Sequence, residues 1–324
     1  MSGRPEILTL ADGQPAPVWW YGAAGDAPSR SGSDAPTVVL VHGFRGDHHG
    51  LAAIATALGA ALPGARVVVP DLPGFGSADP FPGRHDVPAY ARFVRGVAEA
   101  VSPATAPALV GHSFGSIVAA HAAAGDGTAG HGTVENDTSP APERFSSLTL
   151  INPIAAPALE GPQAVLSRLA QAYYAAGARL PERLGQAVLR NGLIVRLMSE
   201  VMATTKDPAL RRYIHDQHRR YFSAFAQRRV VQEAFTASVT GTVTEVANRL
   251  ALPVQLIAGD ADDVAPLDTQ RRLHALLPGS ELSVIAGVGH LTHYETPELV
   301  AELIGDFLVR HPGAGASTST GRTA

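Results

Sequence analysis

Six short runs of apolar, largely β-branched residues recur along the chain, with stretches of helical periodicity between most of them. The runs lie at residues 37–41, 66–69, 107–110, 147–151, 253–257 and 281–285. Runs of this kind are typical of strands that are buried on both faces of a sheet. Because strand and helix alternate, the sequence predicts an α/β fold with a mostly parallel sheet flanked by helices.

The segments between and before these strands extend the prediction. Helical periodicity predicts helices over residues 51–62, 89–101 and 114–124. Residues 6–10 and 18–21, separated by the turn signal Asp12-Gly13, predict an antiparallel hairpin at one edge of the sheet.

One long interval breaks the alternation. Between residues 157 and 250 no strand is evident, and helical segments appear at residues 166–178, 193–203 and 210–226. We interpret residues 157–240 as a helical cap inserted into a core domain of residues 1–156 and 241–311, with an extension of the core helices as the alternative. Composition rich in Gly, Thr, Ser and Pro predicts a flexible insertion at residues 125–146 and a disordered tail at residues 312–324.

Composition excludes several classes of function. The 324 residues have a net charge of -4 with both signs interspersed, which gives no electrostatic case for binding nucleic acid or an anionic membrane surface. Without cysteine the chain has no disulfide, thiolate nucleophile or cysteine-ligated metal, and no cofactor or metal is predicted. Residues 1–10 do not resemble a secretory signal and no long apolar span follows, so we expect a cytoplasmic protein without membrane insertion.

The motif Gly111-His112-Ser113-Phe114-Gly115 fits a nucleophile elbow. It follows the short strand at residues 107–110 and precedes an apolar helix, which is the context that the motif requires. Glycines flank the serine because side chains would collide in so tight a turn. The helix that begins at Phe114 directs its N-terminus at the reacting centre and favours negative charge there. The pattern therefore predicts Ser113 as a nucleophile.

A serine hydroxyl needs a base, and the base needs an acid that orients it. The chain order for this elbow is serine, acid, histidine. His290 follows the last predicted strand on the glycine-rich loop 287–289, and we predict it as the base. The rival His293 lies at the start of the closing helix, where we expect a local hydrogen bond.

Three carboxylates compete for the role of the acid. Asp260, Asp262 and Asp263 all follow the strand at residues 253–257, and the motif alone does not choose among them. The spacing from Gly259 and to Pro266 favours Asp262, while either of the others can instead cap the helix near Pro266. The preceding strand is followed by Asn152, so the alternative acid position that some enzymes with this elbow use there is occupied by an amide.

An oxyanion formed during acyl transfer requires backbone N–H donors. We predict those of Phe114, directly after the nucleophile, and of Phe44 in the loop His42-Gly43-Phe44-Arg45-Gly46. His42 is expected to support this loop. Asp71, in the turn at residues 71–76, is expected to bond the backbone.

These motifs, in this order, resemble the α/β-hydrolase superfamily over about residues 37–308, apart from the cap and the insertion. The resemblance is to capped members related to epoxide hydrolases, haloalkane dehalogenases, proline iminopeptidases and bacterial esterases. The first two use an aspartate nucleophile, so Ser113 argues against those activities. Carbon–carbon bond hydrolases often place tryptophan beside the catalytic histidine, where this chain has Leu291.

The sequence therefore predicts a serine hydrolase, specifically a carboxylic-ester hydrolase that acts on a small hydrophobic ester through an acyl-enzyme on Ser113. The cap is expected to line an apolar pocket with residues including Leu169, Tyr174 and Leu197. Hydrolysis of an amide or a carbon–carbon bond is an alternative, as is a non-catalytic ligand-binding protein of the same fold. The oligomeric state does not follow from the sequence.

Overall fold

The predicted α/β architecture is present. The structure is a computed structural model that describes residues 3–22, 36–125, 144–158 and 164–312. Most of the predicted flexible insertion, residues 125–146, and all but the first residue of the predicted tail, residues 312–324, lie outside the described residues. Eight strands form one sheet in the order β1-β2-β4-β3-β5-β6-β7-β8.

The hairpin and the parallel strands lie close to their predicted positions. The hairpin of β1 and β2 pairs antiparallel, β2 also pairs antiparallel with β4, and the pairs from β4 through β8 are parallel. The bounds are β1 Arg4–Thr9, β2 Pro15–Tyr21, β3 Thr37–Val41, β4 Arg66–Pro70, β5 Ala108–His112, β6 Ser147–Ile151, β7 Val254–Gly259 and β8 Glu281–Ile285.

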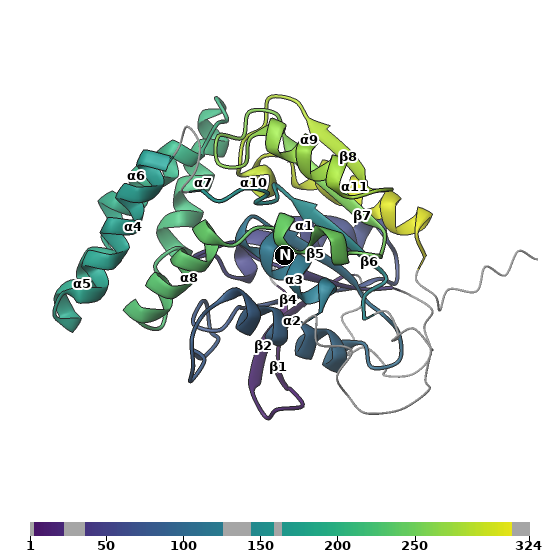
Figure 1. Ribbon diagram of the computed structural model, residues 1–324, viewed down its shortest axis with the longest axis horizontal. Coiled ribbons are helices and arrows are strands. Elements are labelled where there is room, and N and C mark those ends of the chain that lie inside the picture. Colours follow the sequence, from purple (N-terminus) through teal and green to yellow (C-terminus); the bar gives the residue numbers. More distant parts are fainter. Residues whose placement is uncertain (1–2, 23–35, 126–143, 159–163, 313–324) are drawn as a thin grey trace, which may run out of the picture.

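Helices cover both faces of the sheet (Figure 1). Along β3, Val38 and Leu40 belong to one apolar cluster, with α1 and α11, whereas Val39 and Val41 belong to the other, with α2, α3 and α9. Successive side chains of a strand point to opposite faces, so a fully apolar strand supplies two cores. The helices are α1 His48–Ala61, α2 Val87–Val101, α3 Phe114–Ala124, α9 Leu267–Leu276, α10 Thr292–Glu295 and α11 Pro297–Arg310, with a 3-10 helix at Thr244–Arg249.

Strand β8 differs from the prediction of burial on both faces. It lies at the edge of the sheet, and only Ile285 of its five residues is buried. An edge strand has a neighbour on one side alone, and the sequence pattern does not distinguish it from an inner strand.

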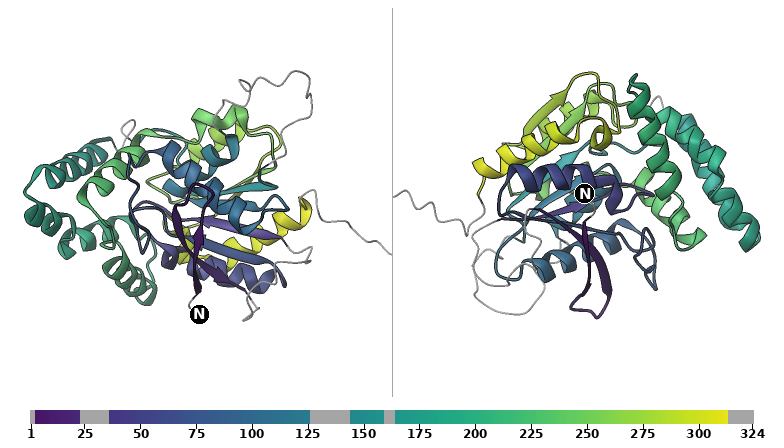
Figure 2. Two further views of the ribbon diagram at one scale, coloured as in Figure 1. Left: turned by 90° about the horizontal axis from the view of Figure 1, so that it is seen from below. Right: turned by 180° about the vertical axis from the view of Figure 1, so that it is seen from behind.

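Among the described residues between β6 and β7, five α-helices form a separate group, and residues 164–240 are here named the α4–α8 segment. They are α4 Ala164–Arg179, α5 Glu182–Leu189, α6 Gly192–Met202, α7 Pro208–Tyr221 and α8 Arg228–Thr240. The group lies at one end of the molecule, with α7 and α8 toward the sheet and α4, α5 and α6 outermost (Figures 1 and 2). No helix of the described residues is both long and apolar enough to span a membrane.

The helix predicted at residues 210–226 ends earlier, at Tyr221. The residues that follow instead pair with the turn at residues 71–76. Gly76 N donates to Ala224 O at 2.9 Å, Ala226 N donates to Gly74 O at 2.9 Å, and Phe75 forms an antiparallel bridge with Phe225. Helical periodicity cannot reveal this pairing because its partner lies about 150 residues away.

The junction of β5 and α3 is packed without room for side chains. A Cβ atom on Gly115 would lie 2.2 Å from Val41 O, and one on Gly111 would lie 2.3 Å from Gly115 O. The helix therefore crosses directly against the end of β3. This contact fixes the direction in which α3 leaves the sheet.

We expect Gly115→Ala to lower the free energy of unfolding by about 2 kcal/mol or more, because backbone must move to admit the methyl group. Urea unfolding followed by circular dichroism measures it. Gly83→Ala is the matched control, since a Cβ there would meet nothing within 4 Å. Equal stability of both variants would show that the junction has space.

Candidate active site

Ser113 lies on the turn between β5 and α3 and has a positive φ. Its φ is 55° and its ψ is -121°. Few residues other than glycine adopt a positive φ, and such strain is found mainly at functional sites. The turn is held by a hydrogen bond from Ser113 N to Ile151 O at 3.0 Å. The conformation leaves Ser113 partly exposed between buried neighbours.

The structure brings the predicted nucleophile, base and acid together. Nε2 of His290 lies 2.8 Å from Ser113 Oγ, and Nδ1 of His290 lies 2.8 Å from Asp262 Oδ2. The three residues come from the ends of β5 and β7 and from the loop after β8. Only a tautomer with the proton on Nδ1 donates to Asp262 and leaves Nε2 to accept from the serine hydroxyl.

Asp262 is buried and has several donors. Its Oδ1 accepts from Val264 N at 2.8 Å and Ala265 N at 2.9 Å. Burial alone would raise the pKa of Asp262, but the facing His290 and these hydrogen bonds outweigh burial, so the pKa lies below its usual value. The carboxylate is thus kept ionised beside the imidazole.

The two competing carboxylates have other positions. Asp260 Oδ1 accepts from Gly287 N at 2.6 Å and so joins the loop after β7 to the loop that carries His290. Asp263 is exposed, and neither residue caps α9.

Asn152 contributes to the site in a way that sequence reasoning missed. Its Nδ2 donates to Asp262 Oδ2 at 2.7 Å, and its own φ is 47°. The same carboxylate oxygen therefore accepts from both Asn152 and His290. The available signal was the position of Asn152 at the end of β6, between the strands that carry the serine and the acid.

The loop after β3 is held next to the serine. His42 Nε2 accepts from Leu72 N at 2.9 Å, and Nδ1 lies 2.9 Å from Gly43 O, so the ring joins two loops as predicted. A Cβ on Gly43 would lie 3.3 Å from Ser113 Cβ. Phe44 packs its ring at 5.6 Å from both Tyr174 and Phe235 of the α4–α8 segment.

Asp71, in the neighbouring turn, bonds the backbone as predicted. It accepts from His48 N and Ser77 N, each at 2.8 Å, and also lies 2.9 Å from His48 Nδ1. Burial alone would raise the pKa of Asp71, but the bond with His48 and the other donors lower it below its usual value.

Arg45, directly after Phe44, is almost completely buried, with a φ of 60°. Its guanidinium donates to Phe222 O at 2.8 Å, Leu189 O at 3.0 Å and Tyr174 Oη at 3.2 Å. All three acceptors belong to the α4–α8 segment. The side chain therefore ties this segment to the loop that carries Phe44.

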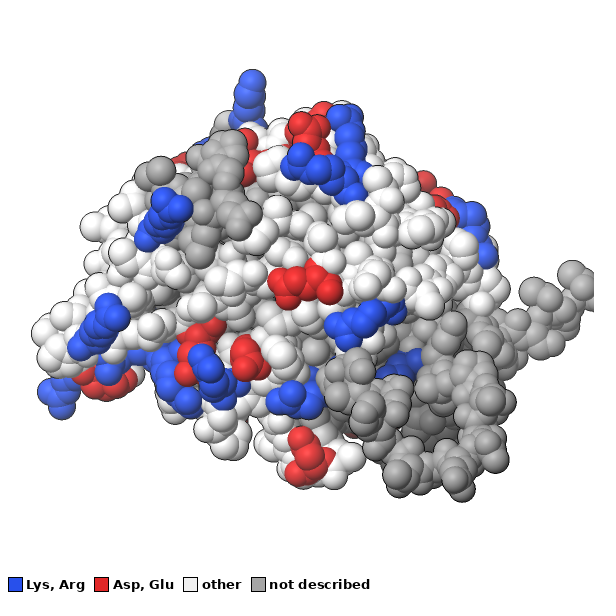
Figure 3. Space-filling view, in the orientation of Figure 1, with Lys and Arg blue, Asp and Glu red and all other residues white. Residues whose placement is uncertain are grey.

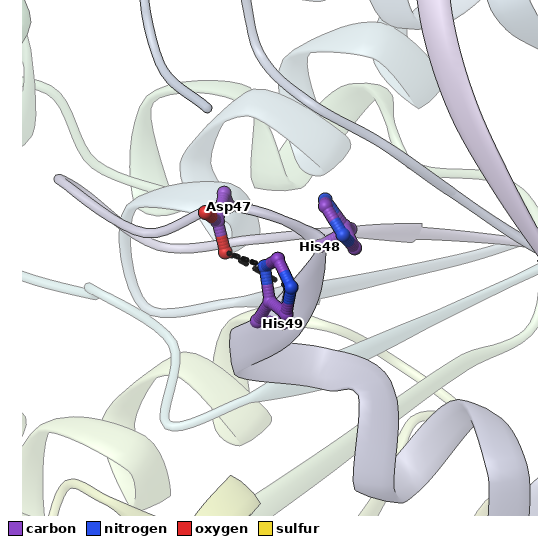
Figure 4. A group of neighbouring side chains, drawn as sticks. All are labelled: Asp47, His48 and His49. Atoms are coloured by element: carbon purple, nitrogen blue, oxygen red, sulfur yellow. Dashed lines mark hydrogen bonds and ion pairs between the residues drawn. The ribbon is translucent and has the colours of Figure 1, made fainter. Parts of the chain in front are cut away.

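Asp47, His48 and His49 lie at the start of α1, with ligand atoms close enough for one metal ion (Figure 4). Their present contacts give them another role. Asp47 caps α1 by accepting from His49 N, and the imidazoles are sandwiched between Trp19, 3.5 Å from His48, and Tyr221, 3.8 Å from His49. The helix N-terminus disfavours a cation. We therefore assign these residues to support of the loop.

Several buried histidines have a lowered pKa and are therefore neutral near pH 7. Burial is the main cause that lowers the pKa of His112 to about 3, and the nearby His290 adds to it. Burial is also the main cause that lowers the pKa of His218 to about 3, with a smaller contribution from His215. Burial also lowers the pKa of His293, whose ring lies 4.1 Å from that of His112. The local hydrogen bond predicted for His293 is not made by its buried Nδ1, which has no partner.

The fold, and a serine that faces a histidine and an aspartate, are typical of hydrolases. A family model described as alpha/beta hydrolase fold matches residues 36–297. The chain therefore belongs to the alpha/beta hydrolase family.

Individual relatives agree with this family. A Bacillus subtilis protein described as the uncharacterized hydrolase YugF is 41% identical over 64 residues, which is 20% of this chain and only 23% of that relative. An esterase from Thermogutta terrifontis, solved with malate bound, has a TM-score of 0.69 at 22% identity and covers 95% of this chain and 99% of its own. An Exiguobacterium antarcticum esterase has a TM-score of 0.70 at 17% identity and covers 94% and 100%. These structural likenesses show the fold.

Replacing Arg45 by Met should lower the free energy of unfolding by roughly 3 kcal/mol, because two buried carbonyls and a hydroxyl lose their donor. Chemical denaturation measures the loss. Arg249→Met is the control, since exposed Arg249 donates to a single carbonyl. If the two variants unfold alike, Arg45 does not hold the α4–α8 segment in place.

We expect stability to fall as the pH is lowered below 6.5. In the unfolded chain His112 and His218 bind protons there, whereas in the folded chain they remain neutral down to about pH 3. Each should therefore cost about 1.4 kcal/mol per pH unit in this window. Urea unfolding at pH 7 and pH 5 measures the difference in the free energy of unfolding. His218→Gln removes one of the two histidines and should reduce the dependence of this free energy on pH by about 1.4 kcal/mol per pH unit. A flat profile would contradict this assignment.

Proposed function

We propose that the chain is a serine hydrolase that cleaves carboxylic esters of small hydrophobic molecules through an acyl-enzyme on Ser113. The observation that carries the proposal is the unbroken pair of 2.8 Å contacts from Ser113 through His290 to Asp262. The residues lie in the order serine, acid, histidine, on loops at the carboxyl ends of parallel strands, where such sites are built.

In the first step, His290 Nε2 takes the hydroxyl proton as Ser113 Oγ bonds to the ester carbonyl carbon. Asp262 stabilises the imidazolium and holds the ring in position through Nδ1. Asn152 holds the carboxylate in turn, through the oxygen that faces the ring. The tetrahedral intermediate then expels the alcohol oxygen, which receives the proton from His290.

The carbonyl oxygen becomes negative during this step, and we assign its stabilisation to the backbone N–H groups of Phe44 and Phe114. Phe114 is the first residue of α3, whose N-terminus favours negative charge. Phe44 lies in the loop that His42 and Arg45 hold. Water then attacks the acyl carbon with His290 again as the base, releasing the acid and restoring Ser113.

The α4–α8 segment is the proposed cap over this site. Besides the contacts of Phe44 and Arg45, Thr204 lies against Gly289, beside the base, and Thr205 N donates to Glu295 Oε1 at 3.3 Å. The rings of Phe44, Tyr174 and Phe235 favour an apolar acyl or alcohol group. Leu169 and Leu197, predicted to line the pocket, are instead exposed to solvent.

The proposed activity is tested with p-nitrophenyl esters of increasing acyl length. We expect Ser113→Ala to lower the rate by at least about a thousandfold while the fold is retained. Ser116→Ala is the matched control, because Ser116 lies one helical turn further on and its hydroxyl donates to Ser113 O instead of facing His290. Retention of activity in Ser113→Ala would refute the proposal.

A fluorophosphonate probe separates the alternatives. Labelling of Ser113 with ester turnover supports the esterase. Labelling without turnover of any ester contradicts the substrate class and favours amide or carbon–carbon bond hydrolysis. An unlabelled, folded protein that binds small molecules favours the non-catalytic binding protein.

A further inference from the structure

The outer side of the α4–α8 segment carries a concentration of exposed large apolar side chains. Five of them are between 58% and 81% exposed: Leu169 on α4, Leu184 on α5, and Leu193, Leu197 and Val201 on α6. The three on α6 are spaced by four residues and so form a stripe along one side of the helix. Large apolar side chains exposed in this number on neighbouring helices are typical of an interaction site. We call the exposed side of α4, α5 and α6 the outer face.

The same segment is strongly basic, although the whole chain is acidic. Residues 164–240 contain 12 lysine and arginine residues and five aspartate and glutamate residues, whereas the rest of the chain contains 13 and 24. Figure 3 shows basic side chains over this end of the molecule, some of them beside acidic ones and others surrounded by uncharged surface. The net charge of -4 therefore conceals two regions of opposite sign.

The acidic residues of the segment are already engaged. Four of them form ion pairs with its own arginines: Glu182, Glu200, Asp216 and Glu233. The fifth, Asp207, caps α7. Within the described part of the chain, no ion pair involves the exposed Arg168, Arg179 or Arg183 of α4 and α5. Their charge is available to an anionic partner.

Charge decides between two apolar partners, a second copy of the chain and a lipid surface. A two-fold dimer through the outer face would set two basic surfaces against each other. A membrane rich in anionic lipid has both the apolar interior and the opposite charge, and helices with this composition lie in its interface.

We propose that the outer face docks onto the surface of an anionic lipid membrane. The leucines and Val201 enter the boundary between headgroups and acyl chains, while the free arginines bind lipid phosphates. The acidic remainder of the molecule is repelled and faces away from the membrane. This orientation places the segment that contacts Phe44 between the lipid and Ser113, but docking itself does not require the serine.

Sedimentation with vesicles tests the proposal. We expect binding to mixed phosphatidylglycerol and phosphatidylcholine vesicles to exceed binding to phosphatidylcholine alone by at least about tenfold, and to weaken with salt. The triple variant Leu193→Ser/Leu197→Ser/Val201→Ser, and the triple variant Arg168→Glu/Arg179→Glu/Arg183→Glu, should each reduce binding about tenfold or more. Circular dichroism confirms that each is folded, and Ser113→Ala should bind as the parent does.

Matched controls alter the same residue types on the rest of the protein. Ile7→Ser/Val309→Ser removes exposed apolar side chains, and Arg84→Glu/Arg92→Glu/Arg272→Glu reverses exposed charges. Both should bind like the parent. The proposal is overturned if neither vesicle is bound, if binding ignores lipid charge, or if the controls lose as much as the outer-face variants. The proposal is also overturned if the parent protein binds no lipid but forms a dimer, and the triple variant Leu193→Ser/Leu197→Ser/Val201→Ser dissociates that dimer.

Discussion

The close approach of α3 to the end of β3 is the constraint on which the rest of the site depends. It requires glycine at positions 111 and 115, and it forces the residue between β5 and α3 into a positive φ. A helix that starts this near the sheet presents its first N–H groups at the same point as the Ser113 side chain. The loop after β3 meets the turn there as well, since Gly43 lies against Ser113. One packing contact therefore places the proposed nucleophile, and the loop that carries Phe44 lies beside it.

Arg45 extends this arrangement outward. A buried guanidinium is usually paired with a carboxylate, but the acceptors of Arg45 are two backbone carbonyls and a tyrosine hydroxyl. These two carbonyl oxygens are in position to accept only when the backbone around them is folded. The interaction therefore depends on α5 and on the end of α7 both being in place. The position of the loop with Phe44 is consequently linked to the packing of helices more than a hundred residues away.

The sequence predicted the sheet, the core helices and the residues of the candidate site because each has a local signal. Apolar runs identify β3 to β7, the glycines identify the elbow, and chain order with spacing separates Asp262 from its neighbours. The contacts of Asn152 and Arg45 were not predictable in this way. Their partners lie in distant segments, and an asparagine at a strand end or an arginine in a loop has the same local pattern whether buried or exposed. The position of β8 at the edge depends on the strand order of the whole sheet, and the apolar run at residues 281–285 gives no information on that order.

The α4–α8 segment shows where hydrophobic periodicity is ambiguous. A stripe of leucines on a helix predicts that one side is apolar, but not whether that side meets the core or the outside. Leu169 and Leu197 satisfied the pattern expected of pocket residues, whereas the structure buries Tyr174, Val195 and Ser199 and leaves the leucines exposed. Whole-chain charge has the same weakness, since a sum of -4 contains a basic segment and an acidic remainder. The apolar stripe and the net charge become informative only when they are assigned to a particular surface. On the outer face the two features coincide. The helices that expose apolar side chains there also carry arginines without an acidic partner among the described residues.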